Sequence, residues 1–514
     1  MAGLATLTIG TPGWRGLNKQ QSGAVLPPGW ATTALNLVLD DQGRMSVRAG
    51  TRAVSTSGIP GPVDATIQQA HYYLDRNGTE VLIAAANNKL WRLDGLSWTD
   101  ITGTATTPTA DNWQFANFNG KVVGWQEAHN PIVMSTSGGS FSDIAPSSGT
   151  VPLGRAVLAA WGRLWVLDKD TLYFSDLLDE TGWATGTAGS LLLTQVWPEG
   201  VDIPVGLAEF NDSLVIFGQS QIVLYGGPDD PASPFSSFQK EEGIAGLGCV
   251  ARDSIRNVGR DIMFLSNKGM RTLGRVIQEK SKPVTDAAPQ VRDFLLQQAA
   301  DGPAENIKSA FAEFQGFYVL ILESTVLVFD LRNTLEDGSF RVTEWQPRYR
   351  AIAADKDGKL VLSQDNDMYR YQGRKDNVAA DGSGGDTIRM EFEGVWNDFE
   401  DGSGIGQRVK HLKRVKIFVN GGAGQTVAFR WAVDYQSRTV QRNIDIPPGE
   451  NEARWGVARY SVDFYSGEFT FNTETTNASR SGQVIKIGII TDVDGVPFAI
   501  DRVTLWATVG KLSL

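Results

Sequence analysis

A polar turn followed by a short apolar strand recurs along the first three quarters of the chain at nearly constant spacing. Gly78, Gly120 and Gly162 are 42 residues apart, as are Gly316 and Gly358, and the other intervals are somewhat longer. A repeat of about 40–50 residues built from short strands is the length that one four-stranded blade of a β-propeller requires. The turns that begin the units are Asn77-Gly78, Asn119-Gly120, Trp161-Gly162, Asn211-Asp212, Gly259-Arg260, Gln315-Gly316 and Asp357-Gly358.

The strands themselves are clearest in residues 205–275. Asn211-Asp212 precedes the apolar run Leu214–Phe217, and Gly259-Arg260 precedes Ile262–Leu265. Turn residues that bound short apolar runs indicate antiparallel hairpins.

A second repeat supports the same period. Residues 94–101 and 137–144 align at an offset of 43 and place an aromatic residue, Trp98 or Phe141, at the same point of a turn. This pattern resembles a degenerate Asp-box turn of sialidase-type propellers, which is a structural feature and not a catalytic one.

We therefore predict an all-β chain whose propeller has about seven blades, with six to eight possible. The 56 glycines and 15 tryptophans agree with many turns and short strands. A tandem pair of β-sandwiches is the rival, but it does not explain the equal intervals.

Composition shifts divide the chain into four predicted segments. Residues 1–60 are an arm with one or two strands, in which 34–51 form a surface hairpin, and residues 61–375 are the propeller. Residues 376–387 are a Gly-rich linker. Residues 388–514 hold longer alternating strands that predict a β-sandwich. The expected strands are Ile388–Val395, Val415–Val419, Val427–Val433, Glu468–Thr473, Val484–Ile490 and Arg502–Val509.

One short helix is expected to interrupt the propeller repeats. Val291, Phe294, Leu295 and Ala299 form a single apolar stripe at helical spacing. Pro289 suits the first turn, and Thr285 or Asp286 can cap the helix. The stripe favours packing on the propeller edge over contact with a partner.

Composition excludes several classes of function. The net charge of −11 is unlike that of a protein that holds nucleic acid tightly, and suits a wall past which DNA slides. The single cysteine, Cys249, allows no intramolecular disulfide. We find neither a signal peptide nor an apolar run long enough to span a membrane.

No group of residues predicts catalysis, a cofactor or a metal. His71, His129 and His411 lack metal-ligand spacing. Cys249 is interpreted as a buried residue, and the preceding GIAGLG run as room for a tight turn. Asp365, Asn366 and Asp367 lack the rest of a calcium loop. Acidic pairs such as Asp229-Asp230 and Glu241-Glu242 are interpreted as solvated, although a glycosidase could use such carboxylates.

The most basic segment runs from Arg408 to Lys416. The favoured interpretation is an edge strand that lysines protect from pairing. Contact with an acidic partner or with DNA is the alternative.

Four stretches resemble the packaged-DNA stabilisation proteins of short-tailed bacteriophages, also called tail hub or nozzle proteins. They are ALNLVLDDQGRMSVRAGT (34–51), LAAWGRLWVLDKDTLYFSD (158–176), FNDSLVIFGQSQIVLYGG…EEGIAGLGCVARDSI…IMFLSNKGMRTLG (210–274) and GQVIKIGIITDVDGVPFAIDRVTLWATVG (482–510). The resemblance runs from about residue 30 to the end of the chain and implies no catalytic residue.

The resemblance implies a structural virion protein, located in the tail and assembled in the host cytoplasm. Its expected partners are other copies of itself in a hexameric ring, the portal or head-to-tail adaptor, and tail fibres or tailspikes. The ring would continue the DNA channel, help to retain the packaged genome, and let double-stranded DNA pass. No tip domain that would close the channel is identifiable, so two alternatives stay open: the chain gates the DNA itself, or a separate tail needle or plug is a further partner.

Two other functions stay open. A carbohydrate-binding or glycan-cleaving propeller, such as a tail-associated glycanase or lectin, agrees with the Asp-box-like turns and the many tryptophans. A propeller scaffold of cellular origin ranks last.

Overall fold

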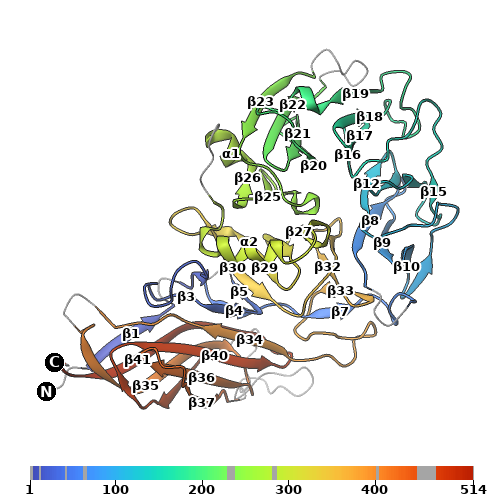
Figure 1. The fold of residues 1–514 in the computed structure, drawn as a ribbon. Helices are drawn as coiled ribbons and strands as arrows, with labels where there is room; N and C mark the ends of the chain where they lie inside the picture. The colour runs from blue at the N-terminus through green and yellow to red at the C-terminus, as the bar shows by residue number, and fades with distance from the viewer. Residues whose placement is uncertain are drawn as a thin grey trace, which may run out of the picture. The chain divides into compact units, whose positions relative to one another are not determined.

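The computed structural model describes residues 4–10, 13–40, 43–61, 66–228, 238–279, 286–400, 405–447 and 471–512. They form two compact units (Figure 1). Unit 1 comprises Met1–Arg52, Val328–Gln346 and Tyr371–Leu514, and unit 2 comprises Ala53–Leu327 and Pro347–Arg370. Three of the four unit boundaries fall within strands, namely β7 (Thr51–Ala53), β29 (Val326–Thr334) and β33 (Asp367–Tyr371), and the fourth lies between Gln346 and Pro347.

Unit 2 is the predicted propeller. Six successive antiparallel sheets of three or four strands lie around a ring, and the hairpin of β27 and β28 occupies one further position in it (Figure 1). This arrangement agrees with the predicted count of about seven units, with six allowed. The first sheet consists of β8 (Gln69–Leu74), β9 (Glu80–Ala86), β10 (Lys89–Asp94) and β11 (Ser97–Asp100), and the second of β12 (Gln114–Phe118), β13 (Lys121–Trp125), β14 (Ile132–Met134) and β15 (Ser142–Asp143). The third consists of β16 (Ala156–Ala160), β17 (Arg163–Asp168), β18 (Thr171–Phe174) and β19 (Gly189–Leu192). The fourth consists of β20 (Pro204–Phe210), β21 (Ser213–Gly218), β22 (Gln221–Gly226) and β23 (Lys240–Ala245).

The remaining ring positions follow in chain order. They are β24 (Arg256–Asn257), β25 (Ile262–Ser266) and β26 (Gly269–Thr272); the hairpin of β27 (Lys308–Ala312) and β28 (Phe317–Ile321); and β31 (Ile352–Ala354), β32 (Leu360–Gln364) and β33.

The predicted turn motifs occupy one equivalent place in every ring position. Each lies between the first strand and the second, where the chain reverses. In Asn119-Gly120, Trp161-Gly162 and Asn211-Asp212 both residues have positive φ, from 48° to 71°. Two such residues make a type I′ turn, whose twist matches that of the paired strands. The repeat seen in the sequence is therefore the inner hairpin of the blade.

Apolar side chains hold neighbouring blades together. Trp91 and Trp98 of the first sheet pack in one buried cluster with Ala353, Val361 and Met368 of the last, and this cluster closes the ring. Phe141, the equivalent of Trp98 one period later, is also buried. Each aromatic of the Asp-box-like turns therefore contributes to the packing between blades.

The predicted helix is confirmed as α2 (Arg292–Ala300), preceded by a 3-10 turn that contains Pro289. Leu295 and Ala299 are buried, as the stripe requires, and α2 packs on β26. A shorter helix that we did not predict, α1 (Leu273–Glu279), follows β26 directly. Asp286 does not cap α2 through its side chain, and Thr285 lies outside the described residues.

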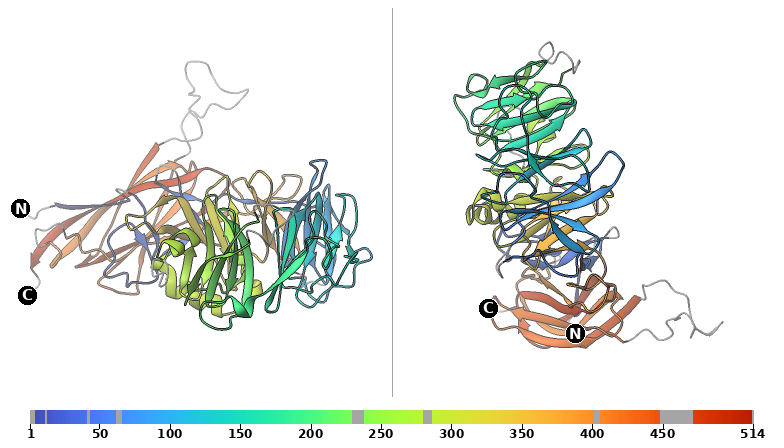
Figure 2. Two further views of the ribbon diagram at one scale, coloured as in Figure 1. Left: turned by 90° about the horizontal axis from the view of Figure 1, so that it is seen from above. Right: turned by 90° about the vertical axis from the view of Figure 1, so that its right-hand side faces the viewer.

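Unit 1 contains the predicted β-sandwich. One sheet has the order β38-β35-β41-β6-β5 with β1 and β39 added, and the other contains the order β30-β4-β34-β40-β36-β37. In Figure 2 the C-terminal strands are coloured orange to red. The strands of these two sheets are β1 (Leu4–Ile9), β4 (Thr33–Leu35), β5 (Leu37–Leu39), β6 (Met45–Val47), β30 (Phe340–Trp345), β34 (Ile388–Glu393), β35 (Arg408–Gly421), β36 (Thr426–Val433), β37 (Val440–Asp445), β38 (Phe471–Asn477), β39 (Ser481–Gly482), β40 (Ile485–Val493) and β41 (Phe498–Leu512). Two further strands, β2 (Gly16–Leu17) and β3 (Trp30–Ala31), form a separate parallel pair.

The N-terminal segment contains more strands than we predicted. The hairpin expected within 34–51 exists as β5 and β6, but Leu37, Leu39 and Met45 are buried, so it is not a surface hairpin. Arg48 is 1% exposed, and its guanidinium donates to Asn36 Oδ1 at 2.9 Å and to both carboxylate oxygens of Asp376 at 2.6 and 2.8 Å. This network joins the N-terminal segment to residues of the predicted linker.

The edge-strand interpretation of the basic segment is wrong. β35 has β41 on one side and β38 and β39 on the other. Its register shifts between Leu412 and Arg414, which interrupts the alternation of side chains and explains why the basic residues do not share one face. Lys410 is buried, and its Nζ donates to the carbonyls of Gly406 and Gln483 at 2.9 and 2.7 Å.

The GIAGLG run yields the first testable prediction. A Cβ at Gly248 would lie 2.3 Å from the carbonyl carbon of Gln219 and 2.4 Å from the carbonyl oxygen of Gly218. Gly248→Ala should therefore destabilise the protein by about 1–3 kcal/mol, as overpacking does. Gly138→Ala is the matched control, because nothing lies within 4 Å of its added Cβ. Thermal unfolding checks both, and equal melting temperatures for the two variants would contradict the steric account.

Candidate functional site

The propeller contains a cavity between the first strands of several of its sheets. Its volume is about 520 Å³, and residues of β8, β12, β24, β27 and β31 line it. Since these are the first strands of five of the seven ring positions, the cavity lies on the inner side of the ring. Its charged lining consists of Glu80, Asp253, Glu313, Asp355, Arg256 and Lys356.

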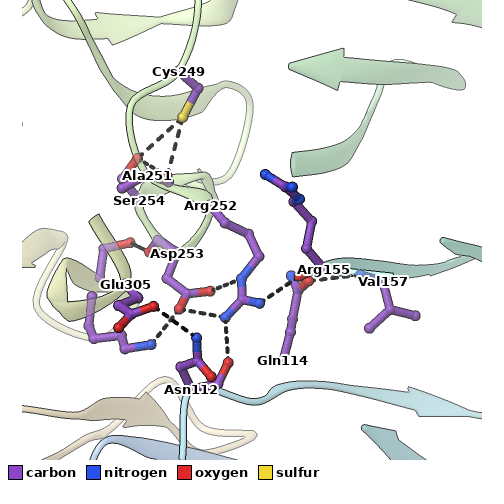
Figure 3. Close-up of polar contacts among 12 residues, drawn as sticks. Asn112, Gln114, Arg155, Val157, Cys249, Ala251, Arg252, Asp253, Ser254 and Glu305 are labelled. Carbon is purple, nitrogen blue, oxygen red and sulfur yellow. Dashed lines mark hydrogen bonds and ion pairs between the residues drawn. The ribbon is translucent and has the colours of Figure 1, made fainter. Parts of the chain in front are cut away.

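Asp253, which is part of the lining of this cavity, belongs to a group of buried charged side chains. Asp253 lies in a 3-10 turn (Arg252–Ser254), and its carboxylate accepts hydrogen bonds from Lys308 Nζ at 2.6 Å and from Arg252 at 2.9 and 3.0 Å (Figure 3). The side chains of Asp253 and Lys308 are 3% and 4% exposed. Such an ion pair is stable only where further hydrogen bonds satisfy its charges.

Those further bonds come from three other parts of the ring. Arg252 also donates to the carbonyl of Arg155 at 2.6 Å and to that of Asn112 at 3.1 Å (Figure 3). Ser309 donates to the carbonyl of Asp253 at 2.7 Å. We call Arg252, Asp253 and Lys308 the central charge cluster. It joins the second, third and fifth sheets and the β27–β28 hairpin.

The cluster carries excess positive charge. Burial alone would raise the pKa of Asp253, but the charges of Arg252 and Lys308 outweigh it and hold that pKa well below its usual range. Burial lowers the pKa of Lys308, although Asp253 opposes this shift. Asp253 therefore stays ionised and cannot donate a proton.

His71 lies on the wall of the same cavity. Its Nε2 lies 3.1 Å from Asn117 Oδ1, and its ring contacts that of Phe115 with centroids 5.8 Å apart. Burial lowers the pKa of His71 to about 4; the bond to Asn117 opposes the shift and the charge of Arg256 adds to it. His71 is thus neutral near pH 7.

The other histidines do not line this cavity. His129 lies between β13 and β14, where its ring nitrogens are 2.9 and 3.2 Å from the carbonyls of Asn130 and Thr107. His411 lies on β35 in unit 1. In the part of the chain that the structure describes, no group of three or more His, Cys, Asp or Glu side chains could hold a metal ion.

Cys249 is buried, as expected, and burial raises the pKa of its thiol to about 12. Its Sγ donates to the carbonyl of Ala251 at 3.2 Å. Of the acidic pairs, Glu241-Glu242 lies on β23 with Glu241 accepting a bond from Ser213, and Asp229-Asp230 lies outside the described residues. Asp365 and Asn366 lie in the turn between β32 and β33, and Asp367 is the first residue of β33.

Sequence reasoning missed the central charge cluster. Arg252 and Asp253 follow the GIAGLGCV run after Ala251, and Lys308 begins a strand 55 residues after Asp253. The only feature of the sequence that could have indicated this cluster is the adjacent pair of opposite charges, Arg252 and Asp253. Such pairs are equally common in solvated loops.

Comparison with known proteins yields distant structural likenesses only. No family model and no curated protein matches the chain. The extracellular domain of a hybrid two-component system protein from B. thetaiotaomicron aligns at a TM-score of 0.42 and 10% identity, over 63% of this chain and 39% of that chain. YCF48 from Cyanidioschyzon merolae aligns at 0.36 and 10%, over 62% and 98%.

An exo-β-1,3-galactanase from Phanerochaete chrysosporium, solved with galactose, aligns at a TM-score of 0.28 and 10% identity, over 90% of this chain and all of that chain. At these scores the likenesses carry no argument about function. The fold assignment rests on the sheets of this chain. None of the described helices is long and apolar enough to cross a bilayer.

Protonation of His71 should make the stability of the folded protein depend on pH. Because the pKa of His71 lies at about 4 when folded against 6.5 when unfolded, the unfolded chain binds more protons between these values. Stability is therefore complete above about pH 6.5 and falls as the pH drops toward 4. His71→Gln should remove that part of the loss, and His411→Gln, on β35, should keep it. Urea unfolding at a series of pH values from 7 to 4 measures this loss of stability. Identical profiles of unfolding free energy against pH for His71→Gln and the unmodified protein would contradict the prediction.

Proposed function

We propose that this chain is a structural subunit of a bacteriophage tail ring, of the tail hub or nozzle class. It would form a hexamer below the portal and adaptor, extend the DNA channel and anchor fibres or tailspikes. The observation that carries the proposal is the place of the four stretches that resemble this class. They coincide with β4 to β7, β16 to β18, β20 to β26 and β40 to β41, so they include core strands of both units.

Two of these stretches contain buried contacts that depend on their particular residues. Residues 34–51 provide the Asn36–Arg48 bond and Gly50, where an added Cβ would lie 1.9 Å from the carbonyl oxygen of Lys375. Residues 210–274 provide Gly248 and the Arg252–Asp253 pair. The resemblance therefore rests partly on buried residues that fix the fold of each unit, which supports a shared architecture.

The chemistry of the ring centre also supports a scaffold. Its most buried charges bond to one another and to backbone carbonyls of other blades. A glycan-cleaving propeller instead requires a protonated carboxyl near an ionised one. Asp253 is held ionised, and Glu80 accepts a hydrogen bond from the backbone N–H of Lys356 at 2.8 Å.

Negative-stain electron microscopy of the purified chain, alone and mixed with the adaptor ring of the same phage, tests the proposal. We expect six-fold rings with an open centre in at least one sample, because a heterologous interface that closes by rotation gives a ring. Single particles in both samples, together with release of reducing sugar from bacterial surface glycan, would contradict the proposal and favour the glycanase alternative.

A further inference from the structure

A hollow of about 220 Å³ lies on the sheet of unit 1 that contains β34, β40 and β36. The register of these strands explains its floor. Glu393 lies opposite Gly488, and Gly488 lies opposite Arg430. One row across three strands thus carries an acid, a residue without a side chain, and a base. The missing side chain opens the space between the two charged ones.

Two aromatic rings form part of the lining of this hollow. Trp396 follows β34 and Tyr435 lies in the β36–β37 turn, with ring centroids 5.0 Å apart and planes at 52°. Tyr435 is 58% exposed. An exposed pair of large rings beside polar groups is a feature of ligand sites, where aromatic faces supply contact area and a few polar groups fix orientation.

The backbone at Tyr435 strengthens this interpretation. Asp434 and Tyr435 have φ of 51° and 58°, a conformation that glycine and asparagine adopt at least cost. The side chain of Asp434 holds the turn by accepting the N–H of Gln483 at 2.6 Å. Asp434 and Tyr435 are the central residues of a turn that the N–H of Gln436 closes by donating to the carbonyl of Val433 at 3.0 Å, and this turn holds the Tyr435 ring in its exposed position at the hollow.

The polar groups offer both donors and acceptors. Lys486 Nζ bonds to Glu393 at 2.9 Å, and Arg430 bonds to Gln441 through Nε at 2.9 Å. Ser437 and Thr439 add hydroxyls to the lining. A mixture of this kind matches a ligand with many hydroxyl groups better than an anion, which would need donors alone.

We propose that this hollow binds a saccharide, with one pyranose ring against Tyr435 and Trp396 and its hydroxyls bonded to Arg430, Lys486 and Glu393. The volume is smaller than the roughly 300–1,000 Å³ of sites for drug-sized ligands, which suits a single sugar ring. The site is independent of the proposed ring role and lies outside the propeller cavity.

Gly488 provides a variant that closes the site without breaking the sheet. A Cβ there would make only ordinary contacts, at 3.4 Å from the carbonyl oxygen of Phe392 and 3.6 Å from the Cβ of Arg430. Gly488→Val therefore fills the floor with a residue that suits a strand. Tyr435→Gly removes the ring and relieves the strained φ, so it should keep or raise the melting temperature.

Saturation-transfer NMR on the full chain, with glucose, galactose, mannose, N-acetylglucosamine and rhamnose as separate probes, tests the proposal. We expect transfer to at least one sugar and binding weakened about tenfold or more in Gly488→Val and in Tyr435→Gly. Phe314→Ala is the matched control, because Phe314 is 77% exposed and lies in unit 2. Transfer to none of the sugars, transfer unchanged in both site variants, or equal loss in Phe314→Ala would overturn the proposal.

Discussion

The ion pair between Asp253 and Lys308 is the interaction on which the propeller ring most depends. The inner strands of a ring lie close together, so polar and charged groups that are buried there must form hydrogen bonds with other groups of the protein. The central charge cluster supplies them, because Arg252 reaches carbonyls of two other sheets while Asp253 holds Lys308 of a further hairpin. The aromatic clusters between blades then add apolar burial around this polar centre.

Much of the fold could be predicted because its signals are local. Asn211-Asp212 and Gly120 mark turns through their own backbone preferences, and the apolar runs beside them pair with near neighbours in the chain. The repeat therefore predicted the propeller and its approximate blade number, and the apolar stripe at helical spacing predicted α2. The six strands expected after residue 387 overlap β34, β35, β36, β38, β40 and β41, whereas β37 and β39 were not predicted.

The parts that escaped prediction depend on contacts between distant residues. Residues 328–346 lie in the range assigned to propeller repeats, yet they cluster with the two chain termini in unit 1. The sequence around Arg48 suggests a surface residue. Its guanidinium is buried because it forms an ion pair with the carboxylate of Asp376, far along the chain. The basic strand β35 is not an edge strand, because β38 and β41 pair with its two sides. The sequence of β35 itself contains no pattern that predicts these partners. For the candidate sites, the sequence correctly placed Cys249 in the core, but the central charge cluster and the aromatic hollow arise from the fold.

A double-mutant cycle on Asp253→Asn and Lys308→Met measures most directly whether the ring depends on its central charges. Asp253→Asn leaves the buried ammonium of Lys308 without its carboxylate partner, so this variant should lose about 3–5 kcal/mol of unfolding free energy. Lys308→Met should lose less, because Arg252 still pairs with Asp253. The double variant should lose clearly less than the sum of the two, because the buried ammonium that Asp253→Asn leaves unpaired is then absent. Single variants within about 0.5 kcal/mol of the unmodified protein, or strictly additive losses, would contradict the account.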